Sequence, residues 1–248
     1  MVKTIFRFCV LPAGLTVLLG AAVAAQDFQK TYQLPAGGSI RIGNISGDVT
    51  VTGYDGTAIV VTGTKEGRDK EVVQIEDRST ASTVEVAVRY PHHCNDCNAS
   101  VQFRVQVPRS ISYNFSSIHS ISGDVNVTSI TGRLDASTVS GTVHVTDVTG
   151  SVSAKSVSGD VDVQISRLEG TDDMNFSTVS GNVTAGLPAG LDASVEMSSF
   201  SGSIDTSFPI EIKEDRFTSG HRASGQIGSG SRRLRMSTMS GNLSLRQL

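Results

Sequence analysis

Residues 122–157 read SGDVNVTSI, TGRLDASTV, SGTVHVTDV and TGSVSAKSV, four consecutive segments of nine residues that begin with Ser-Gly or Thr-Gly. The two dipeptides alternate, which indicates a structural unit of about 18 residues with two similar halves. Apolar residues follow each glycine by two, four and seven positions, as Val125, Val127 and Ile130 follow Gly123. Alternation with a period of two predicts a short strand with one buried face.

The glycine at the start of each segment predicts a corner of the backbone. Glycine adopts a positive φ without steric cost, and a Ser or Thr before it can hydrogen-bond the turning chain. A nine-residue period of strand and corner is typical of β-solenoids, whose coils stack about 4.8 Å apart. We expect structural corner glycines at Gly47, Gly123, Gly132, Gly141, Gly150, Gly159, Gly181, Gly202 and Gly241.

The composition agrees with an all-β protein and excludes several classes. The 248 residues are 38% hydrophobic and 18% charged, with 25 Gly and no Trp, so neither a disordered tail nor a membrane bundle fits. The formal net charge of −3 provides no basic field for a phosphate backbone. We therefore expect no nucleic-acid partner.

The first 25 residues have the three parts of a secretory signal peptide. Lys3 and Arg7 precede an apolar run that ends in small residues before Gln26. The run is interrupted by Pro12 and Gly14 and is shorter than the ~20 residues of a membrane span, so no transmembrane anchor is expected after cleavage. The remaining chain is expected to be one continuous domain. Residues 26–107 would form a strand-rich part with longer hairpins and a Cys-x-x-Cys loop, and residues 108–248 would form solenoid repeats of about 18 to 22 residues per coil.

Four motifs in a fixed order resemble a known bacterial family. They are Leu-Pro-Ala-Gly-Gly from Leu34, Asn-Ile-Ser-Gly-Asp-Val-Thr-Val from Asn44, the Arg-Tyr-Pro segment with its Cys-Asn-Asp-Cys, and the closing Gly-Ser-Gly-Ser-Arg-Arg-Leu-Arg-Met from Gly228. The chain resembles, from about residue 28 to 246, a family of exported β-strand-repeat proteins of unknown function labelled as candidate adhesins. The resemblance implies a single-stranded, right-handed β-helix-like fold at the cell envelope. It implies no catalytic residues.

The segment around Cys94 and Cys97 carries the only cluster of metal-ligand residue types. His92 and His93 precede a Cys-x-x-Cys hairpin, which can supply zinc ligands, but a second pair of ligands is missing. In an oxidising compartment the favoured interpretation is a Cys94–Cys97 disulfide. The alternatives are a metal site at His92, Cys94 and Cys97, and free or redox-active thiols.

Three acids follow Ser-Gly corners, namely Asp48, Asp124 and Asp160, as in calcium-binding nonapeptide solenoids. Because the same position also holds Thr142 and Asn182, we favour solvated corner acids over calcium ligands. His144 is expected on an exposed face between Asn126 and Asp162, if the coil has about 18 residues. Arg232, Arg233 and Arg235 form a basic run that an anionic polymer could meet, although most such runs are solvated.

A polysaccharide hydrolase is the remote alternative. Asp172 and Asp173 could serve as a carboxylate pair, with His221 and the Gly228-Ser229 segment as their partners. However, His221 follows Asp173 by more than two coils, and adjacent residues of a strand face opposite sides. We predict no enzyme, no catalytic residue and no cofactor.

The leading hypothesis is a non-enzymatic envelope protein, periplasmic or displayed on the cell surface, whose sheets present Ser, Thr, Asn and Asp to an envelope polymer or protein. The alternative is a structural or sensory module that acts through strand-edge contacts. In that case the last coil, which ends at Leu245, would leave an unpaired edge for a partner strand or for self-association with a second copy.

Overall fold

The computed structural model describes residues 27–248 apart from 93, 95–96 and 215–219. In this part, the chain forms one hydrogen-bonded sheet of 20 strands and a three-residue 3-10 helix, η1 (Lys70–Val72). The all-β prediction is confirmed. Over the same residues, no helix has the length and apolar character needed to cross a bilayer. The expected signal peptide, residues 1–25, lies outside the described residues.

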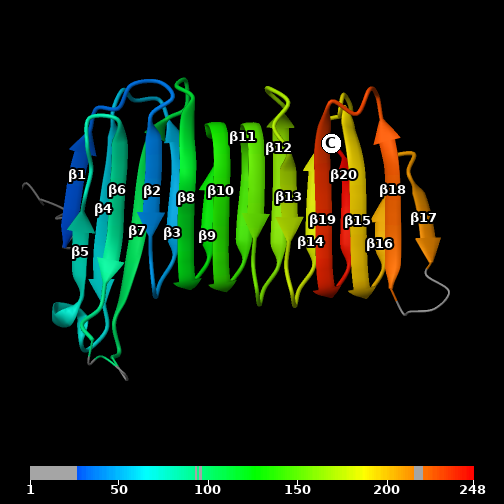
Figure 1. The fold of residues 1–248 in the computed structure, drawn as a ribbon. Coiled ribbons are helices and arrows are strands. Elements are labelled where there is room, and N and C mark those ends of the chain that lie inside the picture. The colour runs from blue at the N-terminus through cyan, green and yellow to red at the C-terminus, as the bar shows by residue number, and fades with distance from the viewer. Residues whose placement is uncertain (1–26, 93, 95–96, 215–219) are drawn as a thin grey trace, which may run out of the picture.

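The sheet folds back on itself into two layers, with the buried side chains between them (Figure 1). Layer 1 consists, in spatial order, of β1 (Phe28–Tyr32), β4 (Ile59–Glu66), β7 (Ser100–Pro108), β3 (Val49–Tyr54), β9 (Val125–Thr128), the first half of β11 (Val143–Lys155), β12 (Val161–Arg167), β14 (Val183–Leu187), β20 (Leu243–Gln247) and β16 (Ile204–Thr206). Layer 2 consists of β5 (Gln74–Asp77), β6 (Thr83–Arg89), β2 (Ser39–Gly43), β8 (Tyr113–Ser122), β10 (Thr131–Ser140), the second half of β11, β13 (Met174–Ser177), β19 (Arg232–Ser240), β15 (Ala193–Ser201), β18 (His221–Ile227) and β17 (Glu211–Glu214).

One strand of layer 2, a Ser-Gly corner and the following strand of layer 1 make a unit that we call a rung. Neighbouring rungs pair in parallel, so that Val125 is opposite Val143 and Val143 is opposite Val161, one repeat unit further along the chain each time. The next step, from Val161 to Val183, is longer, because residues 168–173 form a loop between β12 and β13. Most apolar positions of the repeat point inward, since Val125 is fully buried and Ile130 is 1% exposed. The expectation is wrong at the seventh position after Gly132 and Gly150, where Val139 and Val157 are 45% and 47% exposed. The structure is therefore a solenoid-like stack whose core is a set of aliphatic columns.

The rungs do not follow one another in chain order at the C-terminal end. The last strand, β20, pairs with β14 on one side and with β16 on the other, so the final rung is inserted between two earlier ones. β19 is inserted in the same way between β13 and β15. The prediction that the last coil leaves an unpaired edge at Leu245 is therefore wrong. The chain passes over one rung position at 193–206, continues to β17 and β18, and returns to fill the gap (Figure 1).

The N-terminal part contains rungs as well as hairpins. β2 and β3 lie between β6 and β7 on one side and the rung of β8 and β9 on the other, in parallel pairings. The antiparallel pairs β1–β4, β4–β7 and β5–β6 form the end of the stack, and of these only β5–β6 is a hairpin of consecutive strands. At the other end, β18 pairs antiparallel with β15 and β17. Antiparallel strands thus terminate both layers at the N-terminal end and layer 2 at the other end, where layer 1 finishes with the parallel strand β16.

Candidate binding surfaces

The Ser-Gly corners stack into a single column. The amide of each glycine donates to the serine carbonyl of the next rung, as Gly123 does to Ser140 and Gly141 to Ser158 at 2.9 and 3.1 Å. Gly141 has a φ of 150°, and a Cβ atom there would lie 2.3 Å from the carbonyl oxygen of Gly123. The close approach of the two backbones therefore excludes any side chain at this position. In spatial order, the column consists of Gly47, Gly123, Gly141, Gly159, Gly181, Gly241 and Gly202. Gly132 and Gly150 form a shorter column at the start of the layer 2 strands.

A column of buried hydroxyl groups supports these corners. Three residues before the glycine, a Ser or Thr donates to the glycine carbonyl of the preceding rung, as Thr138 does to Gly123 at 2.8 Å. Thr138 is buried, and burial of its hydroxyl group without a hydrogen-bond partner would destabilise the fold. The column consists of Ser120, Thr138, Ser156, Thr178, Thr238 and Ser199. The serine and threonine richness of the repeat thus has a structural cause at this position.

The corner acids bind backbone amides of the protein. Asp48 accepts from the amide of Asp124 at 2.8 Å, and Asp124 accepts from that of Thr142 at 2.7 Å. Asp160 accepts from the amide of Asn182, and Asn182 accepts in turn from Asn242. An Asn performs the same task as an Asp, so the contact uses an acceptor oxygen rather than a charge. Among the described residues, no group of three or more His, Cys, Asp or Glu side chains is placed to hold a metal ion.

A row of exposed apolar residues runs along the corner edge. They stand two positions before the corner glycines, and they are between 45% and 60% exposed. We call this row the apolar ridge. In spatial order it consists of Ile121, Val139, Val157, Val179, Met239 and Phe200. With a rung spacing of about 4.8 Å, six rungs extend the ridge over about 24 Å.

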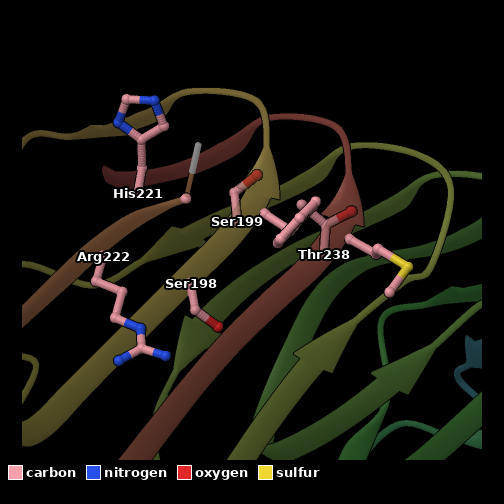
Figure 2. Close-up of a pocket in the computed structure, with 8 residues that line it drawn as sticks. Ser198, Ser199, His221, Arg222 and Thr238 are labelled. Carbon is pink, nitrogen blue, oxygen red and sulfur yellow. The ribbon is translucent and has the colours of Figure 1, made fainter. Parts of the chain in front are cut away.

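A depression of about 260 Å³ lies at the Phe200 end of the ridge. Figure 2 shows His221 and Arg222 on β18 at one side, Ser198 and Ser199 on β15, and Thr238 on β19. A second hollow of about 580 Å³ shares Ser198 and Arg222 with it. In that hollow, Arg235 donates to Glu196 at 2.8 Å. Both depressions lie over β15, β18 and β19, and the first is lined in part by Phe200 and Met239 of the ridge itself.

The outer face of layer 1 carries an uninterrupted polar row. The strand register places these residues side by side across the sheet, and we call them the polar row. In spatial order it consists of Thr62, Arg104, Thr50, Asn126, His144, Asp162, Thr184, Ser244 and Asp205. The expectation that His144 lies between Asn126 and Asp162 is confirmed.

Two contacts hold His144 in the polar row. Its Nδ1 lies 3.2 Å from Oδ2 of Asp162, and its Nε2 lies 2.9 Å from the hydroxyl of Thr146. At the N-terminal end of the row, Thr50 and Arg104 line a hollow of about 320 Å³. The row thus offers donors and acceptors that are fixed by the register of the sheet.

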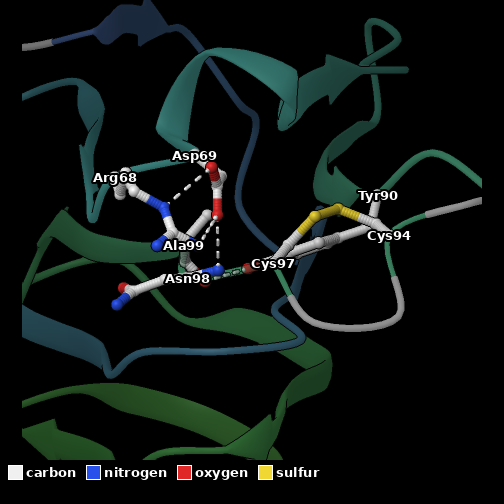
Figure 3. The surroundings of a disulfide bond; sticks show 7 residues. All are labelled: Arg68, Asp69, Tyr90, Cys94, Cys97, Asn98 and Ala99. Carbon is white, nitrogen blue, oxygen red and sulfur yellow. Dashed lines mark hydrogen bonds and ion pairs between the residues drawn. A yellow bond between two sulfur atoms is a disulfide. The ribbon is translucent and has the colours of Figure 1, made fainter.

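Cys94 and Cys97 are positioned as a disulfide, with 5.2 Å between their Cα atoms (Figure 3). Asp69 holds Asn98, the residue after Cys97, because the Asp69 carboxylate accepts a hydrogen bond from the amide of Asn98 at 2.9 Å. A hydrogen bond from Arg68, together with that amide, lowers the pKa of Asp69. Of the three candidate metal ligands, His92 is exposed on the surface, and Cys94 and Cys97 are the disulfide pair. His93, which precedes them, lies outside the described residues.

The structure does not bring the hydrolase candidates together. Asp173 accepts from the amide of Arg233 near the start of β19, whereas His221 is in register with Thr238 near its end. Five residues of a strand separate these levels by about 16 Å. Asp172 contacts Ser151 and Arg133, and Ser229 donates to Asp192.

The basic run is divided among different environments. Arg232 is 8% exposed and donates to the carbonyl oxygen of Gly170. Arg235 pairs with Glu196, and Arg233 is exposed. The interpretation of these three residues as one basic surface is therefore wrong, because the alternation of the strand turns Arg232 inward.

Sequence reasoning missed the apolar ridge and the hydroxyl column. Both lie in the tetrapeptide before each corner glycine, for example Ser137-Thr138-Val139-Ser140. The signal was present, because an apolar residue two positions before the glycine recurs on every Ser-Gly rung from Gly123 onward. Alternation places Thr138 inside and Val139 outside, contrary to their polarity.

The chain is similar to several solved structures. One is from Clostridium sporogenes, described as a candidate cell adhesion protein, with 11% identity, a TM-score of 0.48, and coverage of 89% of this chain and 99% of that chain. Another is a candidate adhesin from Bacteroides fragilis, with 12% identity, a TM-score of 0.38, and coverage of 89% and 96%. A third, a candidate adhesin from Parabacteroides distasonis, has 10% identity, a TM-score of 0.29, and coverage of 89% and 96%. A search of the curated proteins finds no match.

The match to a protein family covers nearly the whole described chain. The model of the Toastrack family of unknown function, DUF4097, matches residues 31–246. This range includes every corner glycine, the apolar ridge and the polar row. The chain therefore belongs to the Toastrack DUF4097 family.

Proposed function

We propose that this protein is a non-enzymatic binding scaffold of the cell envelope, which holds an envelope polysaccharide along the polar row of layer 1. The observation that carries the proposal is the unbroken row from Thr62 to Asp205, in which every strand contributes one polar side chain. Hydroxyl, amide, imidazole and carboxylate groups provide both donors and acceptors. A polymer with many hydroxyl groups can use such groups at several rungs at once.

The regular spacing supports a polymer rather than a small molecule. Neighbouring side chains of the row repeat every ~4.8 Å, and the strands that carry them are held by parallel ladders over most of its length. Weak contacts of this kind add up when one chain engages several of them. The hollow at Thr50 and Arg104 is shallow, as expected for a surface that lets a long chain continue beyond it.

The cellular location is part of the same proposal. An exported protein, in the periplasm or on the cell surface, would meet envelope polysaccharides directly. The signal-like pattern of residues 1–25 supports this placement. Fractionation of the source cells combined with protease treatment of intact cells distinguishes display from periplasmic retention.

The test is binding of the purified protein to immobilised envelope polysaccharides, with variants of the polar row. We expect Asn126→Ala combined with His144→Ala to weaken binding at least tenfold, which corresponds to about 1.4 kcal/mol. Ser137→Ala combined with Ser177→Ala, on the outer face of layer 2, is the matched control and should leave binding unchanged. Absence of binding to every polysaccharide, or equal losses in both variants, would contradict the proposal.

A second measurement addresses the non-enzymatic character. The bound polysaccharide should be recovered without new reducing ends after prolonged incubation. If cleavage occurs and Asp172→Asn or Asp173→Asn abolishes it, the protein is an enzyme and the proposal is wrong.

A further inference from the structure

The apolar ridge is an exposed surface for which the binding of a polysaccharide provides no role. Its six side chains form one continuous line, whereas single exposed apolar residues scattered on a surface need no explanation. The ridge also lies at the corner edge, away from the polar row on the outer face of layer 1. A surface of this kind is typical of a contact with another macromolecule.

The side chains on either side of the ridge limit what can cover it. On the layer 2 side, two positions before the ridge, the row consists of His119, Ser137, Lys155, Ser177, Ser237 and Ser198. On the corner side, three positions after the ridge, the row consists of Asp124, Thr142, Asp160, Asn182, Asn242 and Ser203. The basic groups of these two rows are thus all on one side and the acidic groups all on the other. Lys155 and Asp160 are exposed and belong to the same rung as Val157.

A second copy of the chain matches this arrangement in one orientation. A two-fold axis parallel to the ridge keeps the order of the rungs and exchanges the two sides. Lys155 of one copy is then opposite Asp160 of the other, and His119 is opposite Asp124. The remaining rungs pair hydroxyl groups with hydroxyl or amide groups. The two ridges have the same spacing, so apolar side chains meet on every rung.

The opposite orientation is unfavourable. A two-fold axis across the ridge reverses the order of the rungs and keeps the sides. Each Lys155 then lies opposite a serine or the second Lys155, and each Asp160 lies opposite an amide or the second Asp160. This arrangement loses the contacts between Lys155 and Asp160 and, when it is centred on Val157, brings like charges together. Like charges facing each other at an interface are a strong source of discrimination.

We propose that the apolar ridge is the contact surface of a parallel, in-register dimer of this chain, in which each Lys155 pairs with Asp160 of the second copy. The interface is isologous, as in most homodimers with two-fold symmetry. The stacks then lie side by side along their corner edges, and the polar row of each copy stays uncovered.

Sedimentation equilibrium of the purified protein measures the association. We expect a dimer whose dissociation constant rises at least 100-fold when Val139 and Val157 are both changed to Ser. Ser244→Ala, on the outer face of layer 1, is the control and should leave the constant unchanged. A monomer at all concentrations overturns the proposal, as does a dimer that the two ridge substitutions do not weaken.

Charge reversal tests the orientation of the pair. Lys155→Glu alone should weaken the dimer at least tenfold, and Lys155→Glu combined with Asp160→Lys should restore it. Thermal unfolding of each variant verifies that the fold is kept. The residue after the corner glycine is Thr142 on the neighbouring rung, so a rung does not require an acid at this position. Failure of the double variant to recover, with its fold intact, contradicts the proposed pairing.

Single cysteines give an independent geometric test. With a short bismaleimide reagent, Ile121→Cys and Met239→Cys should each crosslink to itself in the dimer, because the two copies are in register. The unsubstituted protein is the control for native thiols. An antiparallel dimer crosslinks neither variant to itself and overturns the proposed orientation. Binding of a monomer to neutral lipid vesicles through the ridge would instead assign the surface to a membrane and overturn the proposal.

Discussion

The hydroxyl of Thr138 donates a 2.8 Å hydrogen bond to the carbonyl oxygen of Gly123, on the neighbouring rung. Five further Ser and Thr residues make the same contact along the stack. The corner glycine turns the chain, and the hydroxyl of the next rung satisfies the carbonyl group that the turn leaves inside. Each corner is thus held from the adjacent rung, which couples the rungs to one another.

Replacement of Thr138 by Val removes this donor and keeps the shape of the side chain. We expect a loss of about 1 to 3 kcal/mol in the free energy of unfolding, because the buried carbonyl of Gly123 loses its partner. Thr138→Ser keeps the hydroxyl and should retain most of the stability. Denaturant titration followed by circular dichroism measures both variants. Equal stability of the Val variant and the native protein would show that the contact has no energetic role.

Gly141→Ala tests the close approach of neighbouring corners. An added Cβ would collide with the backbone of Gly123, and φ is positive at this residue, so we expect a loss of at least about 2 kcal/mol. Gly190→Ala is the matched control, because no heavy atom lies within 4 Å of a Cβ placed there. The control should change the melting temperature little. A tolerated Ala at position 141 would contradict the stacking of the corners.

Asp192 gives the stability of the C-terminal end a defined pH dependence. Hydrogen bonds, first of all from the Ser229 hydroxyl and then from the amides of Ser231 and Gly230, lower the pKa of Asp192 from 3.8 to about 2. A carboxyl whose pKa is lowered in the folded state stabilises the fold fully above its unfolded value. This contribution is therefore complete above pH about 4 and is lost as the pH falls toward 2.

Unfolding free energies of the native protein and of Asp192→Asn, measured between pH 5 and 2, test this dependence. The Asn variant should show a shallower decline between pH 4 and 2, because it lacks the titrating group. Asp55→Asn, at an exposed carboxyl far from Asp192 in the stack, is a suitable control. Identical pH profiles of the native protein and the Asp192 variant would refute the assigned role.

Reduction of the Cys94–Cys97 disulfide should lower the free energy of unfolding only modestly. The bond closes a ring of only four residues, and the chain-entropy model assigns such a ring about 2 kcal/mol. Thiol titration should find these two cysteines unreactive until a reductant is added, and metal analysis should find no bound zinc. Stoichiometric zinc in the untreated protein would favour the metal interpretation of His92, Cys94 and Cys97.

Much of this architecture could be predicted from the sequence, since local pattern and tertiary structure have the same period. The spacing of Gly123, Gly141 and Gly159 set the register of three rungs, and the apolar alternation placed Val125 and Val143 inside. The position of His144 followed from that register alone. The right-handed winding implied by the family resemblance stays a prediction.

The order of the C-terminal rungs could not be predicted from the same pattern. The segments Ser-Thr-Val-Ser-Gly before Gly181 and Ser-Thr-Met-Ser-Gly before Gly241 are nearly identical, so each fits several neighbours. The order depends on where the chain turns back, after β17 and β18, which is a long-range property. The apolar ridge was missed for a related reason. The alternation of β10 turns Val139 outward, but its use requires knowing that the strand continues to the corner, which the repeat pattern alone does not show.

The position of the final rung is the central claim, since it determines which residues are neighbours in the ridge and in the polar row. Paired cysteines at Asn182 and Asn242 test it directly. Adjacent strands lie about 4.8 Å apart, within the Cα separation of about 4.4 to 6.8 Å that a disulfide spans, whereas strands two rungs apart do not. Under oxidation we predict a 182–242 disulfide in Asn182→Cys/Asn242→Cys and none in Asn182→Cys/Ser203→Cys, as measured by mass spectrometry of proteolytic fragments. A 182–203 disulfide with no 182–242 disulfide would show that the rungs follow chain order, and would contradict the structure described above.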